Sequence, residues 1–577
     1  MTTYPVRIGA ADELREKGRL TGKIGRLPVL VVWHDNRAYA IEDRCPHMGF
    51  PLHQGTVEAG LLTCHWHHAR FDLVSGCTLD PFADDAQAFD VQIDGADVLV
   101  SARPAGDPVE RYRRRLRDGL EQGYTLVIAK AVMGLLEAED GRPETALRTA
   151  LDFGVTYRRD GWGSGLTVLV AMANLLPLLE PEDRPLALVH ALRFVARDTA
   201  GQPPRFAEPP LAGAAREVPA ERLAGWYRRF VDTRSADSSE RTLATAVASG
   251  DLAAVEAMMF AAVTDHVFID EGHTLDFTNK AFEALALVGN ESAAALLPSL
   301  VAQACAADRA EESSEWRHPH DLAALAARTE IELVEALAGS GLGLADHDAS
   351  ALGWALLAEE PDVVVTALVD AARRGASAEQ LGRAVAFAAA LRLVRFHTQN
   401  DHGDWNTVHH AFTTANGLHQ ALTRQPTPEL TRGLVHSALR LYLDRFLNVP
   451  AARLPHAGTG DLTELGECWD SQGQVDRAGA IVAGFLRNGG SREAVVAALG
   501  KALLAEDAGF HWYQVVEAGA RQTLAWPAGS EESALVLVGV ARFLAAHTPS
   551  RRELPTVVQI ASRLRRGEAL YDDPDVA

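Results

Sequence analysis

The chain has 577 residues, and its 77 aspartates and glutamates against 55 lysines and arginines give a formal net charge of −22. Nucleic acids and anionic membranes attract basic surfaces, so this charge argues against both as partners. No secretion signal or membrane-spanning stretch is visible, and the five cysteines do not suggest a disulfide framework, so we predict a cytoplasmic protein.

The first hundred residues carry the pattern of β-strands. A continuous apolar run covers residues 29–33 and is followed by Asp35-Asn36, a typical hairpin turn. A second turn signal, Asp94-Gly95, precedes the apolar residues 98–100. We therefore predict a small antiparallel β domain at residues 1–103.

Two cysteines and two histidines form a spaced motif within this domain. Cys45 and His47 are separated by one residue, and Cys64 and His67 by two, with residues 48–63 between the pairs. Two thiolates and two imidazoles are the ligands of a [2Fe–2S] cluster in which histidines replace the cysteines on one iron. The alternative is a zinc site, but structural zinc motifs usually place two to four residues between paired ligands. The spacing favours the iron–sulfur cluster.

Residues 1–103 resemble a Rieske-type ferredoxin domain. The resemblance rests on PVLVVWHDNRAYAIEDRCPHMGFPL, LLTCHWHHARFDLVSGCTLDP and FDVQIDGADVLVSA. It implies that a [2Fe–2S] cluster is bound by Cys45, His47, Cys64 and His67.

The chain departs from this family at four positions. Where the family usually has CPWHG, His65 replaces the proline and His68 the glycine. Phe50 and Trp66 stand where high-potential respiratory members carry disulfide cysteines, so the chain is similar to the lower-potential members. We expect His65 and His68 to face solvent, with a role as extra ligands or electron-exit groups as the alternative.

Beyond the β domain, the pattern becomes helical. Residues 104–112 form a predicted linker, and alanine and leucine then dominate with apolar residues at helical spacing. The apolar stretch at 165–179 contains Asn174 and Pro177 and indicates a buried helix. The predicted fold class is α+β multidomain, with an all-helical, histidine-rich catalytic domain at 113–577.

Two segments of this helical region concentrate histidines. In residues 265–285, His266, Asp270 and His273 are spaced i, i+4, i+7, which would place them on one face of a helix. Imidazoles and a carboxylate on one face can bind iron or zinc. Residues 397–422 contain five more histidines, and His511 is a weaker candidate farther along. Some of these histidines are expected only to pack or to face water.

A second, shorter resemblance concerns the same segments. HVFIDEGHTLDF and HAFTTANGL are similar to motifs of questin-oxidase-like proteins, which are helical, cofactor-poor oxygenases acting on polyketide-type aromatic or quinone substrates. His266, Gly272 and Asp276 match the first motif, and His410 with Thr413 the second. Val267 and Asp270 depart from the family pattern.

These observations predict an oxidoreductase that consumes O2. The cluster would feed electrons to a non-haem iron bound by His266, Asp270 and His273, and the substrate would be a hydrophobic aromatic or polyketide-like small molecule. His410 would be a further ligand or an acid–base group, with His402, His409 and His511 behind it.

The electron donor and an alternative function also follow from the sequence. No G-x-G-x-x-G motif for a dinucleotide is present, so an external reductase or ferredoxin is expected to supply the electrons. The alternative is an electron-transfer or redox-responsive scaffold protein whose helical domain binds a partner. The sequence leaves the oligomeric state open.

Overall fold

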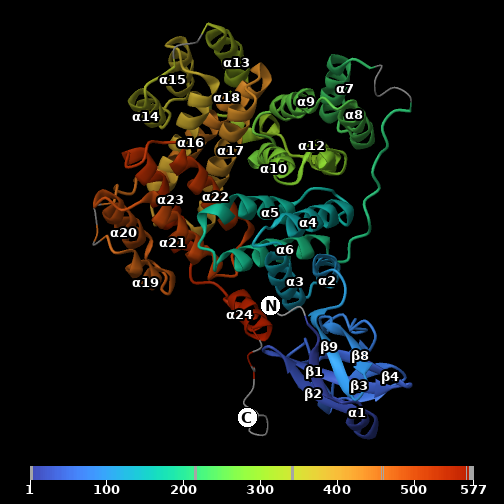
Figure 1. The fold of residues 1–577 in the computed structure, drawn as a ribbon. Helices are drawn as coiled ribbons and strands as arrows, with labels where there is room; N and C mark the ends of the chain where they lie inside the picture. Colours follow the sequence, from blue (N-terminus) through green and yellow to red (C-terminus); the bar gives the residue numbers. More distant parts are fainter. Residues whose placement is uncertain are drawn as a thin grey trace. The chain divides into compact units, whose positions relative to one another are not determined.

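The computed structural model describes residues 4–212, 218–339, 343–455, 458, 460–566, 568 and 570. The chain forms two compact units. The first contains residues 1–150, 188–200 and 553–577, and the second contains residues 151–187 and 201–552. Figure 1 shows the strands at the N-terminal end of the chain and the helices that follow. The predicted order, a small antiparallel β domain and then a large helical region, is confirmed.

The β domain contains two antiparallel sheets. The larger has the order β1-β9-β8-β4-β3-β2, and the smaller has the order β5-β6-β7. The strands are β1 (Val6–Ala10), β2 (Arg19–Ile24), β3 (Leu27–His34), β4 (Arg37–Glu42), β5 (Thr56–Glu58), β6 (Leu61–Thr63), β7 (Arg70–Asp72), β8 (Ala88–Asp94) and β9 (Asp97–Pro104), with a short helix α1 (Ala11–Lys17). The predicted hairpin turn is confirmed, because Asp35 and Asn36 both have positive φ and His34 pairs with Arg37.

Three further helices lie wholly within the first unit. They are α2 (Pro108–Gln122), α3 (Thr125–Ala138) and α24 (Glu553–Arg565). Strand β9 ends at Pro104, and the Asp107 side chain caps α2 by accepting a hydrogen bond from the Val109 N–H. The predicted linker at 104–112 therefore includes the first turn of a helix. The domain boundaries at 103 and 113 stay a prediction.

The second unit consists of helices and their connections. Its helices are α5 (Ser164–Leu175), α7 (Ala220–Asp232), α8 (Ala236–Ser249), α9 (Leu252–Thr264), α10 (His273–Val288), α11 (Ala293–Leu296), α12 (Val301–Ala306), α13 (Leu322–Ala338), α14 (Asp346–Ala355), α15 (Pro361–Arg373), α16 (Ala378–Val394), α17 (Trp405–Arg424), α18 (Pro428–Leu443), α19 (Leu465–Trp469), α20 (Val475–Arg487), α21 (Arg492–Leu504), α22 (Phe510–Leu524) and α23 (Glu531–His547). Helices α4 (Glu144–Thr156) and α6 (Arg184–Thr199) contain residues of both units.

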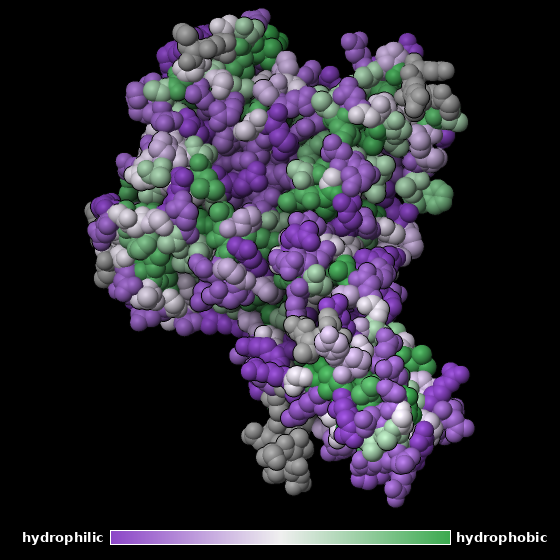
Figure 2. Space-filling view, in the orientation of Figure 1, coloured by the Kyte–Doolittle hydropathy of each residue, from purple (hydrophilic) through white to green (hydrophobic). Residues whose placement is uncertain are grey.

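The visible face of the protein mixes hydrophilic and hydrophobic areas. Figure 2 shows hydrophilic residues over much of the visible face, interrupted by small hydrophobic patches. Among the described residues, no helix is both long and apolar enough to cross a membrane. Residues 165–175 of the apolar stretch lie in the buried helix α5, as predicted, whereas Leu176–Leu178 form the 3-10 helix η2, in which Pro177 is exposed.

Helix α17 organises the core of the second unit. It packs against both α10 and α22 (Figure 1), and most of its side chains are buried. Gly417 allows the close approach to α10, because a Cβ at this position would lie 3.1 Å from Oδ1 of Asp276. The three helices α10, α17 and α22 therefore hold their side chains at short distances from one another.

A buried ionic network locks α5, α10 and α22 together. Nζ of Lys280 lies 2.9 Å from both Glu283 and Glu517, and Nδ2 of Asn174 donates to the same two carboxylates at 2.8 and 3.0 Å. Buried charges are tolerated when they are paired in this way, and removal of one partner is costly. The network fixes the relative positions of helices that carry candidate site residues.

The structure corrects one helical prediction. Residues 265–272 are not α-helical: α9 ends at Thr264, and η3 (Ile269–Gly272) contains residues with positive φ. His266, Asp270 and His273 therefore do not share one helical face. Similarly, His402 lies in the short 3-10 helix η8 (His402–Asp404) before α17 begins.

Candidate functional site

The first candidate site lies in two loops of the β domain, after β4 and after β6. In the first loop, Cys45 donates its N–H to the Phe50 carbonyl and accepts one from Gly49, both at 2.7 Å. Gly49 has a φ of 87°, which glycine adopts without strain. In the second loop, the Cys64 N–H donates to the Ala69 carbonyl at 2.9 Å. These bonds hold both cysteines in tight turns.

The four predicted ligands come together between these loops. Cys45 and Cys64 are buried and free, and their thiols share a hydrogen bond that raises the pKa of Cys45 and lowers that of Cys64. The rings of His47 and His67 lie edge to face with centroids 4.7 Å apart. Nδ1 of His47 is buried and has no hydrogen-bond partner in the described part of the chain. A buried imidazole nitrogen beside two adjoining thiols fits a [2Fe–2S] cluster.

The second loop reaches the surface of the unit. His67 is exposed, and its ring lies 4.5 Å from that of Trp66, which is 41% exposed. His65 is also exposed, and its Nε2 lies 2.6 Å from the Thr56 hydroxyl. His68 is exposed and has a φ of 61°, a left-handed conformation at the position where the family has glycine. The solvent-facing placement expected for His65 and His68 is confirmed.

The second candidate site lies among the helices of the second unit. His273 is the first residue of α10, His410 lies in α17, and His511 is the second residue of α22. One ring nitrogen from each lies within 4.8 Å of the others. We call these three residues the histidine cluster. Such a group can hold a metal ion.

Hydrogen bonds fix the orientation of two of these rings. Nδ1 of His410 lies 2.9 Å from Oε2 of Glu271, and Nδ1 of His511 lies 3.1 Å from Oε1 of Gln514. Both partners are acceptors, so both Nδ1 atoms carry the proton, and in the neutral imidazole the Nε2 atom then carries the lone pair. The Gln514 orientation is set in turn, because its Nε2 donates to Asp276.

The two Nε2 atoms face each other at 3.3 Å. Two lone pairs at this distance repel unless a proton or a cation lies between them. Burial lowers the pKa of His273 to about 4 and that of His511 to about 3, so these imidazoles are neutral near pH 7. Neutral imidazole is the form that binds metals.

A fourth histidine adjoins the cluster. The ring centroid of His409 lies 4.1 Å from that of His511 and 4.5 Å from that of His410. Both of its ring nitrogens are buried and lack a hydrogen-bond partner within the described residues. Burial and the neighbouring His511 hold the pKa of His409 well below its ordinary value. Unsatisfied buried nitrogens of this kind need an explanation.

The remaining sequence-predicted residues lie outside the cluster. His266 contacts Glu311 through Nδ1 at 2.9 Å, and Asp270 accepts a hydrogen bond from Gln303 at 2.9 Å. The His402 ring lies near that of His547, with centroids 4.7 Å apart and the ring planes tilted by 55°. The structure thus brings together His273, His410 and His511, with His409 beside them.

Sequence reasoning missed Glu271 and Gln514 as partners of the cluster. Glu271 precedes His273 by two residues, yet it contacts a histidine of another helix because its φ is 51°. The hydrogen bond from His410 lowers the pKa of Glu271 to about 2. Gln514 follows His511 by three residues, about one helical turn. This i, i+3 spacing was the sequence feature that could have indicated a contact between the two side chains.

The loop before α10 is held by a close contact with α17. Gly272 has a φ of 92°, and a Cβ there would lie 1.8 Å from Oγ1 of Thr414. Phe268, Asp270 and Glu271 also have positive φ, which is costly for residues with side chains. Backbone strain of this kind often occurs at functional sites.

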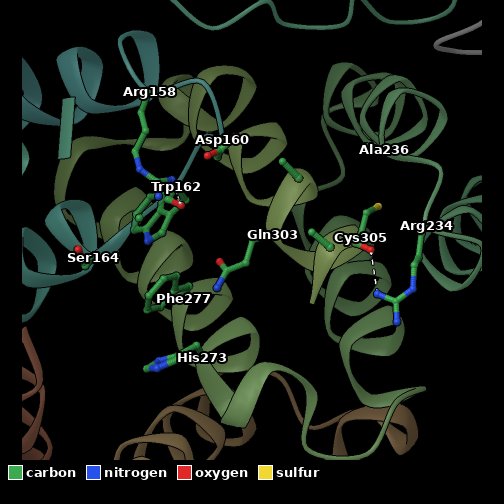
Figure 3. A pocket seen from close by; sticks show the side chains of 13 residues that line it. Arg158, Asp160, Trp162, Ser164, Arg234, Ala236, His273, Phe277, Gln303 and Cys305 are labelled. Atoms are coloured by element: carbon green, nitrogen blue, oxygen red, sulfur yellow. Dashed lines mark hydrogen bonds between the residues drawn. The ribbon is translucent and has the colours of Figure 1, made fainter. Parts of the chain in front are cut away.

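A pocket of about 760 Å³ opens beside the cluster (Figure 3). In this view His273, Phe277 and Trp162 lie along one side of the pocket, and Arg234 and Cys305 lie on the other. Gln303 projects from α12 into the space between. Its Nε2 donates to Asp270, while its Oε1 is buried and has no partner in the portion of the chain described. The pocket therefore has one aromatic side and a polar side chain, Gln303, whose amide oxygen has no partner among the described residues and is closed to solvent in this conformation.

The β domain with its paired Cys-His loops defines a Rieske-type iron–sulfur protein. The Rieske [2Fe-2S] domain family matches residues 4–90. The ferredoxin component of the alkene monooxygenase system of Xanthobacter autotrophicus (strain ATCC BAA-1158 / Py2) is 30% identical over 100 residues, which cover 17% of this chain and 82% of the ferredoxin. The chain belongs to the Rieske [2Fe–2S] family through this N-terminal domain.

Two further similarities concern a comparable length of chain. Apoptosis-inducing factor 3 of Homo sapiens is 29% identical over 130 residues, or 21% of this chain and 22% of the human protein. The chain therefore matches less than a quarter of that relative's length. A solved ferredoxin of carbazole 1,9a-dioxygenase from Nocardioides aromaticivorans IC177 is 29% identical and covers 17% of this chain and 99% of its own, with a TM-score of 0.17.

Proposed function

We propose that this protein is an O2-dependent oxidoreductase in which electrons from the Rieske cluster are used at a non-haem iron bound by His273, His410 and His511. The observation that carries the proposal is the 3.3 Å distance between the Nε2 atoms of His410 and His511. Two nitrogens about 2.1 Å from one metal ion, at roughly a right angle, would lie about 3 Å apart. The geometry of the apposed rings fits a shared metal ion.

The surrounding residues would support such a site. Glu271 and Gln514 accept the Nδ1 protons and so present the Nε2 lone pairs inward, as outer partners of metal-binding histidines commonly do. His409 offers a further neutral nitrogen beside them. Iron held by imidazoles, with positions left open, would supply one-electron chemistry and dioxygen activation when bound.

The attached Rieske domain favours a redox metal over zinc. The cluster is a one-electron carrier, and joining it to its acceptor in one chain raises its effective concentration to about millimolar. The ferredoxin relative is named as a component of a monooxygenase system. An external reductase or ferredoxin would supply the electrons, and the cytoplasmic location stays a prediction.

The pocket beside His273 is the proposed substrate site. Trp162 and Phe277 would contact a flat, hydrophobic molecule, and Oε1 of Gln303 would accept a hydrogen bond from its hydroxyl group. The assignment of the Gln303 amide oxygen and nitrogen cannot be exchanged, because the flipped amide would place its oxygen against the Asp270 carboxylate. The resemblance to questin-oxidase-like proteins stays a prediction.

Metal and sulfide analysis tests the proposed iron site. We expect anaerobically purified protein to contain more than two irons for every two acid-labile sulfides, with a Rieske EPR signal after reduction. His410→Ala and His511→Ala should lose the additional iron and keep the Rieske signal. His266→Ala is the matched control and should keep both. Two irons per chain would contradict the proposal and favour an electron-transfer or scaffold protein.

A pair of probes tests the substrate pocket. We expect 1-naphthol to bind the iron-loaded protein roughly five- to tenfold more tightly than 1-methoxynaphthalene, because only the first can donate to Gln303. Gln303→Met should abolish this preference when binding is followed by calorimetry. Equal binding of both probes to the unmodified protein would rule out the proposed role of Gln303.

A further inference from the structure

A buried lysine from the helical region contacts the first cluster-binding loop. Lys130 lies in α3, beyond the residues 4–90 that match the Rieske family, yet its side chain is only 7% exposed. Its Nζ donates to the carbonyls of Pro46 and His47, the latter at 3.1 Å. A cation therefore lies directly behind the backbone of one histidine ligand.

Two arginines of the neighbouring helix α2 form hydrogen bonds to the β domain. Arg115 of α2 donates to Asp84 at 3.0 Å and also to the Ala83 carbonyl. Arg114 donates to Asp85 at 2.7 Å. These contacts hold α2 against the β domain, and α3 packs against α2 within the first unit, which brings Lys130 to the ligand loop.

The charge of Lys130 bears on the redox chemistry of the cluster. With two thiolate and two neutral imidazole ligands, the cluster gains a negative charge on reduction, and its potential depends on nearby charges and hydrogen bonds. A buried cation is poorly screened by solvent and favours the more negative state. The two hydrogen bonds also hold the carbonyls that precede and follow the Cα of His47.

We propose that Lys130 is a positioning residue that raises the reduction potential of the Rieske cluster. It holds the His47 loop through two carbonyls and stabilises the reduced cluster through its charge. The helices beyond the Rieske domain are thus part of the cluster environment. This inference does not depend on the proposed iron site, because it concerns only the first unit.

Redox titration of full-length variants tests the inference. We expect Lys130→Met to lower the equilibrium constant for cluster reduction by about tenfold, which corresponds to a midpoint potential about 59 mV more negative for a one-electron couple. Lys130→Gln should also lower the potential, whereas Lys130→Arg should stay close to the unmodified protein. Arg113→Met, an exposed cation of α2 paired with Glu110, is the matched control and should leave the potential unchanged.

Sulfide content decides the outcome if a variant assembles the cluster poorly. Loss of sulfide in Lys130→Met and Lys130→Gln, with retention in Lys130→Arg, would support the inference because the charge would then be required to keep the cluster. Native potential in both neutral variants would overturn it. Equal loss of sulfide in all three variants would also overturn it, because the loss would then arise from altered packing and not from removal of the charge.

Discussion

Oε2 of Glu271 lies 2.9 Å from Nδ1 of His410, although Glu271 adopts the left-handed backbone conformation with a φ of 51°. The strained loop before α10 is what brings this carboxylate to a histidine of α17. The contact links backbone conformation to the orientation of a proposed metal ligand.

Removal of this carboxylate should weaken metal binding. We expect Glu271→Ala to lower the iron affinity of the second unit about tenfold, the lower end of such effects, because the side chain is 70% exposed and its charge is screened. Glu271→Gln should be milder because its amide oxygen can still accept the proton. Competition with a chelator measures the affinity, and an unchanged value for Glu271→Ala would contradict the assigned role.

Gly272 should not tolerate a side chain. We expect Gly272→Ala to destabilise the protein by about 2–4 kcal/mol, because φ is 92° and the new Cβ would collide with Thr414. Denaturant unfolding measures the change. Gly225→Ala is the matched control: this position lies inside α7 with no atom within 4 Å of an added Cβ, so a stabilisation of up to about 1 kcal/mol is expected.

A double variant relieves the worst part of the collision. Thr414→Ala combined with Gly272→Ala should recover only part of the loss, because Cβ of residue 414 still lies 2.8 Å from the added Cβ and the positive φ remains unfavourable for alanine. Full recovery would show that the collision alone matters.

His68→Gly should stabilise the cluster loop. A φ of 61° is unfavourable for histidine and ordinary for glycine, so we expect a gain of about 0.5–1 kcal/mol. The thermal loss of the cluster's visible absorption gives the readout. His65→Gly relieves no such strain and loses the contact with Thr56. The cluster of this variant should therefore lose its absorption at a lower temperature than that of the unmodified protein. A lower bleaching temperature for His68→Gly would contradict the expectation.

Asp276 should make stability depend on pH. Burial raises its pKa to about 7 from an ordinary 3.8, with Glu517 and Glu283 adding to the rise and Lys280 opposing it. A raised pKa means that the stabilising contribution is fully present below about pH 3.8 and is lost as the pH rises through about 7. The maximal slope is about 1.4 kcal/mol per pH unit.

Asp276→Asn should remove this pH-dependent contribution to stability, and the asparagine oxygen can still accept the hydrogen bond from Gln514. Unfolding free energies of the two proteins should therefore diverge between about pH 4 and 7, with the unmodified protein falling relative to the variant. The exposed Asp461 serves as a control, since Asp461→Asn should not reproduce the divergence. Parallel curves for Asp276→Asn would show that its carboxyl is not protonated in the folded state.

The two proposed iron sites should be separable. Cys45→Ser should remove the sulfide and the Rieske EPR signal, because the buried thiolate pair would be broken. The additional iron should stay, since the histidine cluster lies in the other unit. Iron and sulfide analysis on the same sample gives both readings. Loss of all iron in Cys45→Ser would show that every iron belongs to the cluster.

The sequence by itself determined the features that depend on near neighbours. The two residues of the hairpin turn, Asp35 and Asn36, are adjacent. Within each predicted ligand pair, Cys45 with His47 and Cys64 with His67, the two residues are no more than three positions apart. Spacing alone therefore pointed to these local features. The change from β to helical pattern after residue 103 was equally visible, because residue composition follows local conformation.

Only the tertiary structure decided the composition of the histidine cluster. Helical spacing grouped His266 with His273, but the positive φ values of residues 268–272 break the helix there and redirect each side chain. His410 and His511 are separated by 101 residues, and no periodicity connects them. Their apposition arises from the packing of α17 against α10 and α22, which is a property of the folded core and not of any one segment.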